Sequence, residues 1–200
     1  EAAQSSQPYR TFLDGVIARQ AELVASWLLV GFIHGVMNTD NMSIAGETID
    51  YGPCAFMDVY DPATVFSSID YYGRYAYANQ PSIAHWNLAS LAECLIPLLS
   101  DNRDEGLDLA KQSVAAFADR FNAAYIGGLR RKLGLSTARE GDAELAQDLL
   151  DLMAANKADF TLTFRRLCDV VAGPEADATA RALFDDPAAF DRWAVRWRRR

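Results

Sequence analysis

Apolar residues recur at intervals of three and four positions along most of the chain, which is the spacing of amphipathic helices. Phe12, Val16 and Trp27 follow this spacing between residues 9 and 31, and Gly31 is expected to end that helix. The same spacing predicts further helical segments over residues 82–100, 104–135, 141–157, 159–173, 177–186 and 187–200. The chain is therefore predicted to be mainly α-helical.

Capping and breaking residues refine these predicted helices. Ser82 and Asp142 stand at the starts of two of them and are expected to be N-caps. Gly127 and Gly128 are expected to weaken the segment 104–135, which Gly134 ends. Cys94 lies in the apolar stretch LAECLIPLL and is expected to be a buried thiol.

Two short segments depart from the helical pattern. Residues 42–45 and 48–50 are β-prone and are separated by Gly46, so a small β-hairpin is expected there. Residues 53–81 have no sustained period but are rich in Tyr and Phe, which indicates a long, ordered and functional loop. The predicted fold class is mainly α with a small β-hairpin.

Composition narrows the possible partners. Half of the 200 residues are hydrophobic and the net charge is −8, which argues against a nucleic-acid binder despite the basic end RWAVRWRRR. No run of apolar residues approaches the roughly 20 needed to span a bilayer, so no membrane partner is expected. Three widely spaced cysteines form no metal or disulfide pattern, which fits a reducing, cytoplasm-like compartment.

Oxygen-bearing side chains gather at the two ends of the predicted hairpin. Asn38, Asp40 and Asn41 precede it and Asp50 ends it, so the hairpin can bring Asp40 and Asn41 close to Asp50. Two carboxylates and an amide oxygen suit Mg²⁺ or Mn²⁺ carried on a nucleotide phosphate, because Mg²⁺ takes few protein ligands and completes its shell with phosphate and water.

The spacing of these residues is similar to that of a protein-kinase catalytic loop, H-R-D-x-x-x-x-N, followed by D-F-G. His34 and Asn41 keep the distance from His to Asn, and Asp50 with Tyr51 and Gly52 stands in the place of D-F-G. The position of the kinase base is Val36, which cannot accept a proton, and Asp40 is the nearest carboxylate. Asp and Asn are also common in turns and caps, so these residues leave both a nucleotide–metal site and a purely structural loop open.

Longer motifs resemble a known family. HGVMNTDNMSI, TIDYGPCAFMDVYDP, GRYAYANQP and HWNLASLAECL are similar to the selenoprotein O family, called YdiU in bacteria. The resemblance implies a pseudokinase-fold protein adenylyltransferase, which transfers AMP from ATP to Ser, Thr or Tyr hydroxyls of protein substrates with Mg²⁺ or Mn²⁺.

The resemblance also implies residue roles. Asp40 would be the catalytic base, Asn41 and Asp50 would bind metal, and Asp50 would hold the ATP phosphates through that metal. His34 and Gly52 would support the site structurally. A cytoplasmic location is implied for a bacterial member and a mitochondrial one for a eukaryotic member.

The expected organisation is a protein-kinase-like C-lobe lacking the N-lobe. Residues 1–172 would form the C-lobe, with the catalytic loop at 34–41, the DFG-like segment at 50–52 and an activation-segment-like stretch at 53–81. Residues 173–200 would begin a truncated C-terminal helical extension. Because the chain begins at Glu1 without Met, we expect a fragment that is inactive by itself.

Two alternatives remain open on the sequence alone. A kinase-like phosphotransferase would use the same fold to move the γ-phosphate, but it would keep Asp where this chain has Val36. A non-catalytic pseudokinase binding module would use the helical half to recruit partners and would not bind Mg²⁺–nucleotide.

Overall fold

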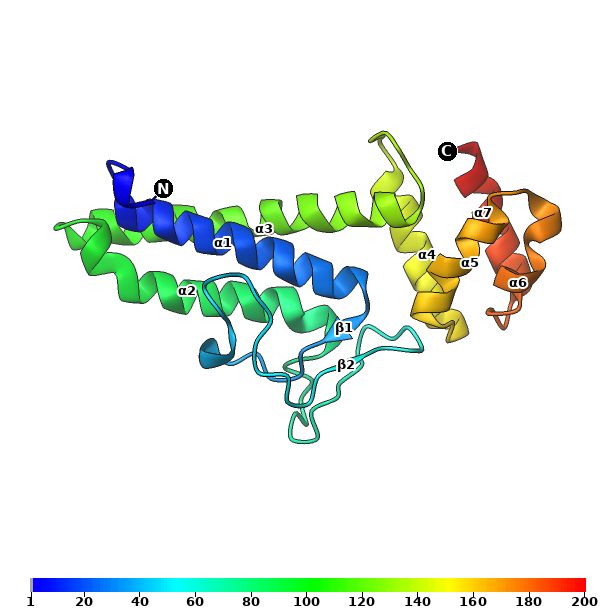
Figure 1. Ribbon diagram of the computed structural model, residues 1–200, viewed down its shortest axis with the longest axis horizontal. Helices are drawn as coiled ribbons and strands as arrows, with labels where there is room; N and C mark the ends of the chain where they lie inside the picture. The colour runs from blue at the N-terminus through cyan, green and yellow to red at the C-terminus, as the bar shows by residue number, and fades with distance from the viewer. Residues whose placement is uncertain (1) are drawn as a thin grey trace.

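The computed structural model describes residues 2–200 and is mainly helical (Figure 1). A short 3₁₀ turn, η1 (Ala2–Gln4), precedes three long helices, which are α1 (Pro8–Leu29), α2 (Gln80–Leu99) and α3 (Arg103–Lys132). The second half contains α4 (Asp142–Asn156), α5 (Phe160–Val170), η4 (Pro174–Ala176), α6 (Ala178–Arg181) and α7 (Pro187–Arg199). Between α1 and α2 lie β1 (Phe32–Ile33), η2 (Thr39–Asn41), β2 (Ala55–Phe56) and η3 (Tyr77–Asn79).

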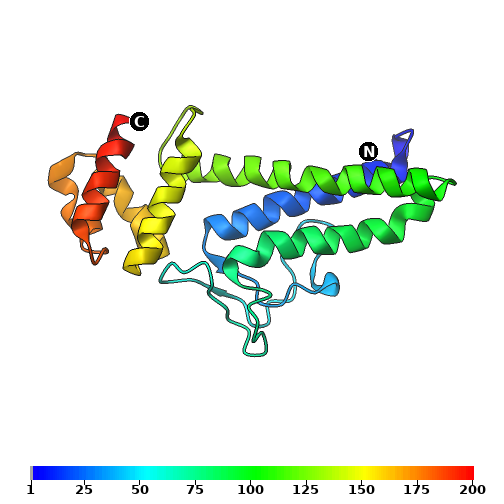
Figure 2. The ribbon, with the colours of Figure 1, turned by 180° about the vertical axis from the view of Figure 1, so that it is seen from behind.

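Helices α1, α2 and α3 pack side by side, and the long connection from α1 to α2 covers one edge of this layer (Figures 1 and 2). Helices α4 to α7 gather at the C-terminal end of α3, so the two chain ends lie at opposite ends of the molecule. Apolar side chains of α1, among them Leu13, Ile17 and Val24, are fully buried because neighbouring helices cover this helix on more than one side.

The predicted hairpin strands at 42–45 and 48–50 are wrong. The sheet instead pairs Phe32 with Phe56 and Ile33 with Ala55 in antiparallel register, and the hairpin region keeps a single bridge between Met42 and Thr48. The physical reason lies in α1, whose Arg19 and Gln20 side chains donate hydrogen bonds to the carbonyls of residues 44 and 43. Those carbonyls are then not available to a partner strand.

Helix α2 begins at Gln80, two residues earlier than predicted, so Ser82 is not its N-cap. Pro81 fits the first turn of a helix because the missing N–H needs no partner there, and Asn79 occupies the cap position. Cys94 is exposed rather than buried. It follows the buried Ala92 by two positions, which turns it to the opposite side of a helix with 3.6 residues per turn.

Helix α3 runs through Gly127 and Gly128 without a break, although this pair was expected to weaken it. A methyl group on Gly128 would lie 2.0 Å from Cδ1 of Leu29, so the glycine permits close contact between α3 and the end of α1. Asp142 is the first residue of α4 and not its cap, since Gly141, with φ +86°, takes that position. The predicted segment 177–186 is helical only over α6.

The loop after β2 joins the two halves of the molecule. The N–H of Tyr60 donates to the carbonyl of Ala158 (2.9 Å), and the N–H of Phe160 donates to the carbonyl of Asp58 (2.7 Å). The Lys132 ammonium donates to the Leu29 carbonyl (2.7 Å) and lies 4.2 Å from the ring centroid of Phe164. Burial lowers the pKa of this lysine.

The helical segment Tyr77–Leu99 is long enough and apolar enough to cross a membrane by length and composition alone. Polar residues, among them Ser82 and His85, interrupt it, so it is not a continuous apolar run of about 20 residues. Core helices of globular folds can have the same length and composition.

Candidate functional site

A buried glutamine fixes the backbone where the candidate loop, residues 34–52, begins. Gln80 accepts a hydrogen bond from the N–H of His34 (3.0 Å) and donates one to the carbonyl of Phe32 (3.0 Å). Its side chain has no exposed surface. The first turn of α2 therefore sets the position at which the chain leaves β1.

The ring of His34 joins the two arms of the loop. Its Nε2 lies 2.8 Å from the carbonyl oxygen of Ile49, and its Nδ1 lies 3.4 Å from the backbone nitrogen of Val36. Since a carbonyl can only accept and an N–H can only donate, Nε2 carries the proton and the ring is neutral. The ring is fully buried beside Trp27, so this connection is shielded from water.

One contact joins the segments 40–42 and 48–50, the bridge from Met42 to Thr48. The segment 48–50 is also held from the other side, by the bond from His34 to Ile49 and a bond from Trp27 Nε1 to the Thr48 hydroxyl (2.9 Å). The bridge joins the residue after Asn41 to the residue two positions before Asp50. Because residues 39–41 form a 3₁₀ turn and Asp50 is left-handed, this pairing does not continue as a ladder to residues 40 and 50.

Asn41 is oriented by its own amide. Its Nδ2 donates to the carbonyl of Val36 (3.0 Å), which leaves Oδ1 with both lone pairs available. The valine at the kinase base position therefore contributes through its backbone. Asn38 is held separately, because its Oδ1 accepts a bond from the Tyr75 hydroxyl (2.6 Å).

The carboxylates of Asp40 and Asp50 are exposed, and neither accepts a hydrogen bond from any other side chain or backbone group within residues 2–200. Asp50 has φ +53°, a left-handed conformation that is uncommon for a residue with a side chain and that often occurs at functional sites. A tight turn follows, in which the N–H of Gly52 donates to the Asp50 carbonyl (2.8 Å).

The oxygen atoms of Asp40, Asn41 and Asp50 suit a divalent ion that is carried on a phosphate better than a metal ion that is bound by protein ligands alone. In the described part of the chain no three His, Cys, Asp or Glu side chains gather as metal ligands. Exposed carboxylates and an amide oxygen without a partner in residues 2–200 are the kinds of ligand that Mg²⁺ or Mn²⁺ takes when phosphate and water complete its shell.

The two glycines of this loop, Gly35 and Gly52, differ in whether the local structure requires a glycine. A Cβ on Gly35, whose φ is +88°, would lie 2.9 Å from Pro53, so the position next to His34 accepts only glycine. A Cβ on Gly52 would meet nothing within 4 Å, and its φ is not left-handed, so no local steric reason demands glycine there.

Sequence reasoning missed the buried amides that support the site. Gln80 was predicted only as part of the loop 53–81, and Asn87, whose Nδ2 donates to the Met37 carbonyl (2.9 Å), was given no role. For Asn87 the available signal was an amide side chain on the apolar face of a predicted helix, where it must find a buried partner, whereas Gln80 lay outside the predicted helix.

Comparison with known proteins gives this geometry a family context. Residues 1–199 match the family model described as "Protein adenylyltransferase SelO". The chain is 64% identical over 200 residues to a protein described as "Protein nucleotidyltransferase YdiU" from Rhodopseudomonas palustris (strain BisB5), covering 100% of this chain and 41% of that relative. Proteins of the same description from Methylorubrum extorquens (strain PA1) and Bradyrhizobium diazoefficiens are also 64% identical, with 41% and 40% of their lengths covered.

The helical layer and the candidate loop therefore occur in a family whose members are described as transferring nucleotides to proteins. The chain belongs to the SelO family. It spans about two fifths of the length of the curated relatives it matches.

Proposed function

We propose that the full-length protein is a protein adenylyltransferase that transfers AMP from ATP to Ser, Thr or Tyr hydroxyls of protein substrates. The observation that supports this proposal is the bridge from Met42, next to Asn41, to Thr48, two residues before Asp50, on a loop whose Asp40 and Asp50 carboxylates are exposed. Membership in the SelO family supports nucleotidyl transfer as the reaction class.

In this proposal Asp40 is the base. The acceptor hydroxyl oxygen attacks the α-phosphorus of ATP, a bond forms between them, and the bond from the α-phosphorus to the β-phosphate oxygen breaks. Pyrophosphate leaves, and the hydroxyl proton passes to the Asp40 carboxylate, which is free to accept it because no other group in residues 2–200 hydrogen-bonds to it.

Asn41 and Asp50 are the proposed metal ligands. The amide bond from Asn41 to Val36 keeps its Oδ1 unpaired, and the turn at Asp50 keeps that carboxylate in solvent. When bound, Mg²⁺ or Mn²⁺ would neutralise charge on the leaving pyrophosphate. His34 would fix the backbone beneath both ligands.

We also propose that residues 1–172 form a kinase-like C-lobe and that residues 173–200 begin a C-terminal helical extension. The His34-to-Asn41 spacing, followed by Asp50, Tyr51 and Gly52 in a tight turn, supports the first part. The long stretch 53–81, which ends at the first turn of α2, would then correspond to an activation segment that faces protein substrates.

The test measures transfer of label from [α-³²P]ATP to protein by the full-length protein with Mg²⁺ or Mn²⁺. Asp50→Ala is expected to lower labelling by about 100-fold or more, because a ligand that stabilises transition-state charge is lost. Glu47→Ala removes an exposed carboxylate from the same loop and is the matched control, expected to label like wild type.

A parallel reaction with [γ-³²P]ATP separates this proposal from phosphotransfer. Label from the α-position alone supports adenylyl transfer, and label from the γ-position alone overturns it in favour of a kinase-like reaction. Equal labelling by Asp50→Ala and wild type would remove Asp50 from the site. Failure to bind Mg²⁺–ATP would leave the binding-module alternative.

A further inference from the structure

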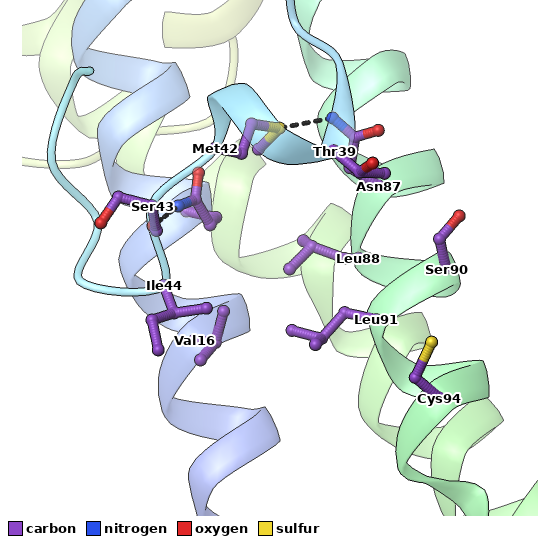
Figure 3. Close-up of a pocket in the computed structure, with 11 residues that line it drawn as sticks. Val16, Thr39, Met42, Ser43, Ile44, Asn87, Leu88, Ser90, Leu91 and Cys94 are labelled. Atoms are coloured by element: carbon purple, nitrogen blue, oxygen red, sulfur yellow. Dashed lines mark hydrogen bonds between the residues drawn. The ribbon is translucent and has the colours of Figure 1, made fainter. Parts of the chain in front are cut away.

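A pocket of about 280 Å³ lies behind the candidate loop, between α1, residues 39–44 and α2 (Figure 3). Its walls are largely apolar and include Val16 from α1, Ile44 from the loop, and Leu88 and Leu91 from α2. Figure 3 shows the side chains of Ile44 and Val16 on one side of the pocket and those of Leu88 and Leu91 on the other.

Two buried amides in this pocket have an oxygen without a partner. Gln20 is 2% exposed and Asn87 is 6% exposed. Within residues 2–200, four buried side-chain atoms lack a hydrogen-bond partner, and Gln20 Oε1 and Asn87 Oδ1 are two of them. Buried polar atoms are nearly always paired, so two such atoms from residues that line one pocket indicate an occupant.

The orientation of both amides is fixed by their other ends. Gln20 Nε2 donates to the carbonyl of Ser43, and Asn87 Nδ2 donates to the carbonyl of Met37. A carbonyl cannot donate, so turning either amide around would set two acceptors against each other. The unpaired atoms are therefore acceptors, and the occupant must supply N–H or O–H donors.

The lining also restricts the charge of the occupant. No Asp, Glu, Lys, Arg or His side chain lines the pocket. An ion would lose its hydration there without gaining a counter-charge, which is strongly unfavourable. A metal would find amide and hydroxyl oxygens but no carboxylate.

We propose that this pocket binds an uncharged small molecule that joins an apolar body to N–H or O–H donors, such as an aryl amide or urea. The donors meet the oxygens of Gln20 and Asn87, and the apolar body lies against the aliphatic walls. This is a second ligand site, separate from the carboxylates of Asp40 and Asp50, neither of which lines it.

Occupancy would act on the candidate loop directly. Thr39 and Met42 line the pocket and flank Asp40 and Asn41 in the chain. A ligand that packs against both holds η2 in one position, so the second site would regulate the first. This regulatory part rests on the proposed function, whereas binding itself does not.

The binding test uses phenylurea, an uncharged ring with N–H donors, on the full-length protein. Cys94 lies at the pocket and is exposed, so its alkylation by iodoacetamide, followed by peptide mass spectrometry, reports occupancy. A ligand of this size binds with a Kd on the order of millimolar, and at about twice the Kd the alkylation rate of Cys94 falls about threefold. Exposed Cys168 on α5 is the internal control and keeps its rate.

Matched compounds and variants make the test specific. 1,1,3-Trimethyl-3-phenylurea keeps the ring but has no N–H, and it should not protect Cys94. Gln20→Met and Asn87→Leu should each weaken protection by phenylurea. Leu91→Trp, which fills the pocket and leaves both amide residues unsubstituted, should abolish protection if an amide variant fails to fold.

Saturable protection by phenylurea alone supports the site. Equal protection by both ureas would overturn the proposal, and so would equal slowing of alkylation at Cys168. Absence of protection at millimolar phenylurea would also overturn it, and would mean that water satisfies the two oxygens. A change of about twofold or more in AMP transfer with phenylurea supports regulation. If AMP transfer itself is absent, the alkylation result still decides the binding site, so the two failures are distinguishable.

Discussion

The imidazole of His34 connects two stretches of backbone that meet at the candidate site. Its protonated Nε2 holds the carbonyl of Ile49, and its Nδ1 faces the N–H of Val36. Both contacts are shielded from water. In the protein interior a hydrogen bond is stronger than in water, and a carbonyl without a partner is costly. One residue therefore fixes the backbone beside both Asn41 and Asp50.

His34→Phe should fill the ring space but leave the Ile49 carbonyl without its donor. We expect a loss of about 1–3 kcal/mol in the free energy of unfolding, because a buried acceptor becomes unpaired. Hydrogen exchange of the amides of residues 48–52 should speed up. His85→Phe changes the other histidine of the chain, which is exposed on α2, and should leave that exchange unchanged. Unaltered exchange at 48–52 in His34→Phe would show that the ring does not hold this segment.

Single residues also mark the limit of what the sequence could predict at the site. The spacing of Asp40, Asn41 and Asp50 around a turn was visible in the sequence, and the structure pairs Met42 with Thr48 between them. The supporting amides Gln20, Gln80 and Asn87 were not, because each looks like an ordinary residue in a helical pattern. Their partners lie 23 to 50 residues away, a distance that helical periodicity cannot encode.

Among the secondary-structure elements, α3 packs against the end of α1 at a glycine. The side chain of Leu29 occupies the space that a Cβ on Gly128 would need, so the Leu29 packing seen here requires glycine at this position. Gly127, its neighbour, faces only the far end of Arg131. The two adjacent glycines therefore have different roles.

This difference predicts opposite effects for two adjacent substitutions. Gly128→Ala should destabilise by about 1–3 kcal/mol through overpacking against Leu29. Gly127→Ala should be neutral or stabilise by up to about 1 kcal/mol, because alanine is the better helix former. Chemical denaturation of the full-length protein, followed by the helical signal of circular dichroism, measures both. A Gly128→Ala variant as stable as Gly127→Ala would contradict the packing account.

The helices were predictable as elements because burial on one face imposes a period of 3.6 residues. The strands were not. Residues 42–45 have β-prone side chains, but Arg19 and Gln20 of α1 take the carbonyls that a strand would share. The actual pair, Phe32–Ile33 with Ala55–Phe56, is two residues long on each side and gives no recognisable alternation. Helix starts were misjudged for the similar reason that Pro81 and Gly141 contribute through backbone geometry.

Across the whole molecule, the C-terminal helix closes onto the start of α4. Arg200 donates to both oxygens of Asp142 and to the carbonyl of Thr137, while Trp193 and Trp197 donate to the carbonyls of Leu145 and Leu133. The hydrogen bond from Arg200 is the main cause that lowers the pKa of Asp142 to about 2. The end of α7 is therefore part of the folded α4–α7 half.

The lowered pKa of Asp142 gives a stability difference that depends on pH. Asp142→Asn should lower the unfolding temperature at neutral pH, because the carboxylate stabilises the fold only when it is ionised. Ionisation of the folded state is lost as pH falls through the folded pKa, so the gap between wild type and variant should hold above about pH 5 and shrink between about pH 4 and 2.

Asp148→Asn is the control for this measurement. Asp148 also pairs with an arginine of α7, Arg196, but both side chains are largely exposed, so its loss should change the unfolding temperature little. Differential scanning calorimetry from pH 7 to pH 2 measures both variants. A gap for Asp142→Asn that stays constant to the lowest pH would contradict the assignment of the shift to the ion pair with Arg200.

Helix α3 passes without interruption from the layer beside the candidate site into the half that holds α4 to α7 (Figure 1). Its 30 residues form a beam about 45 Å long, at a rise of about 1.5 Å per residue. This one helix contacts α1, which precedes the loop with Asp40 and Asp50, and α4 in the other half. Because α3 has no break between these contacts, the position of α4 is fixed relative to α1 by a single helix.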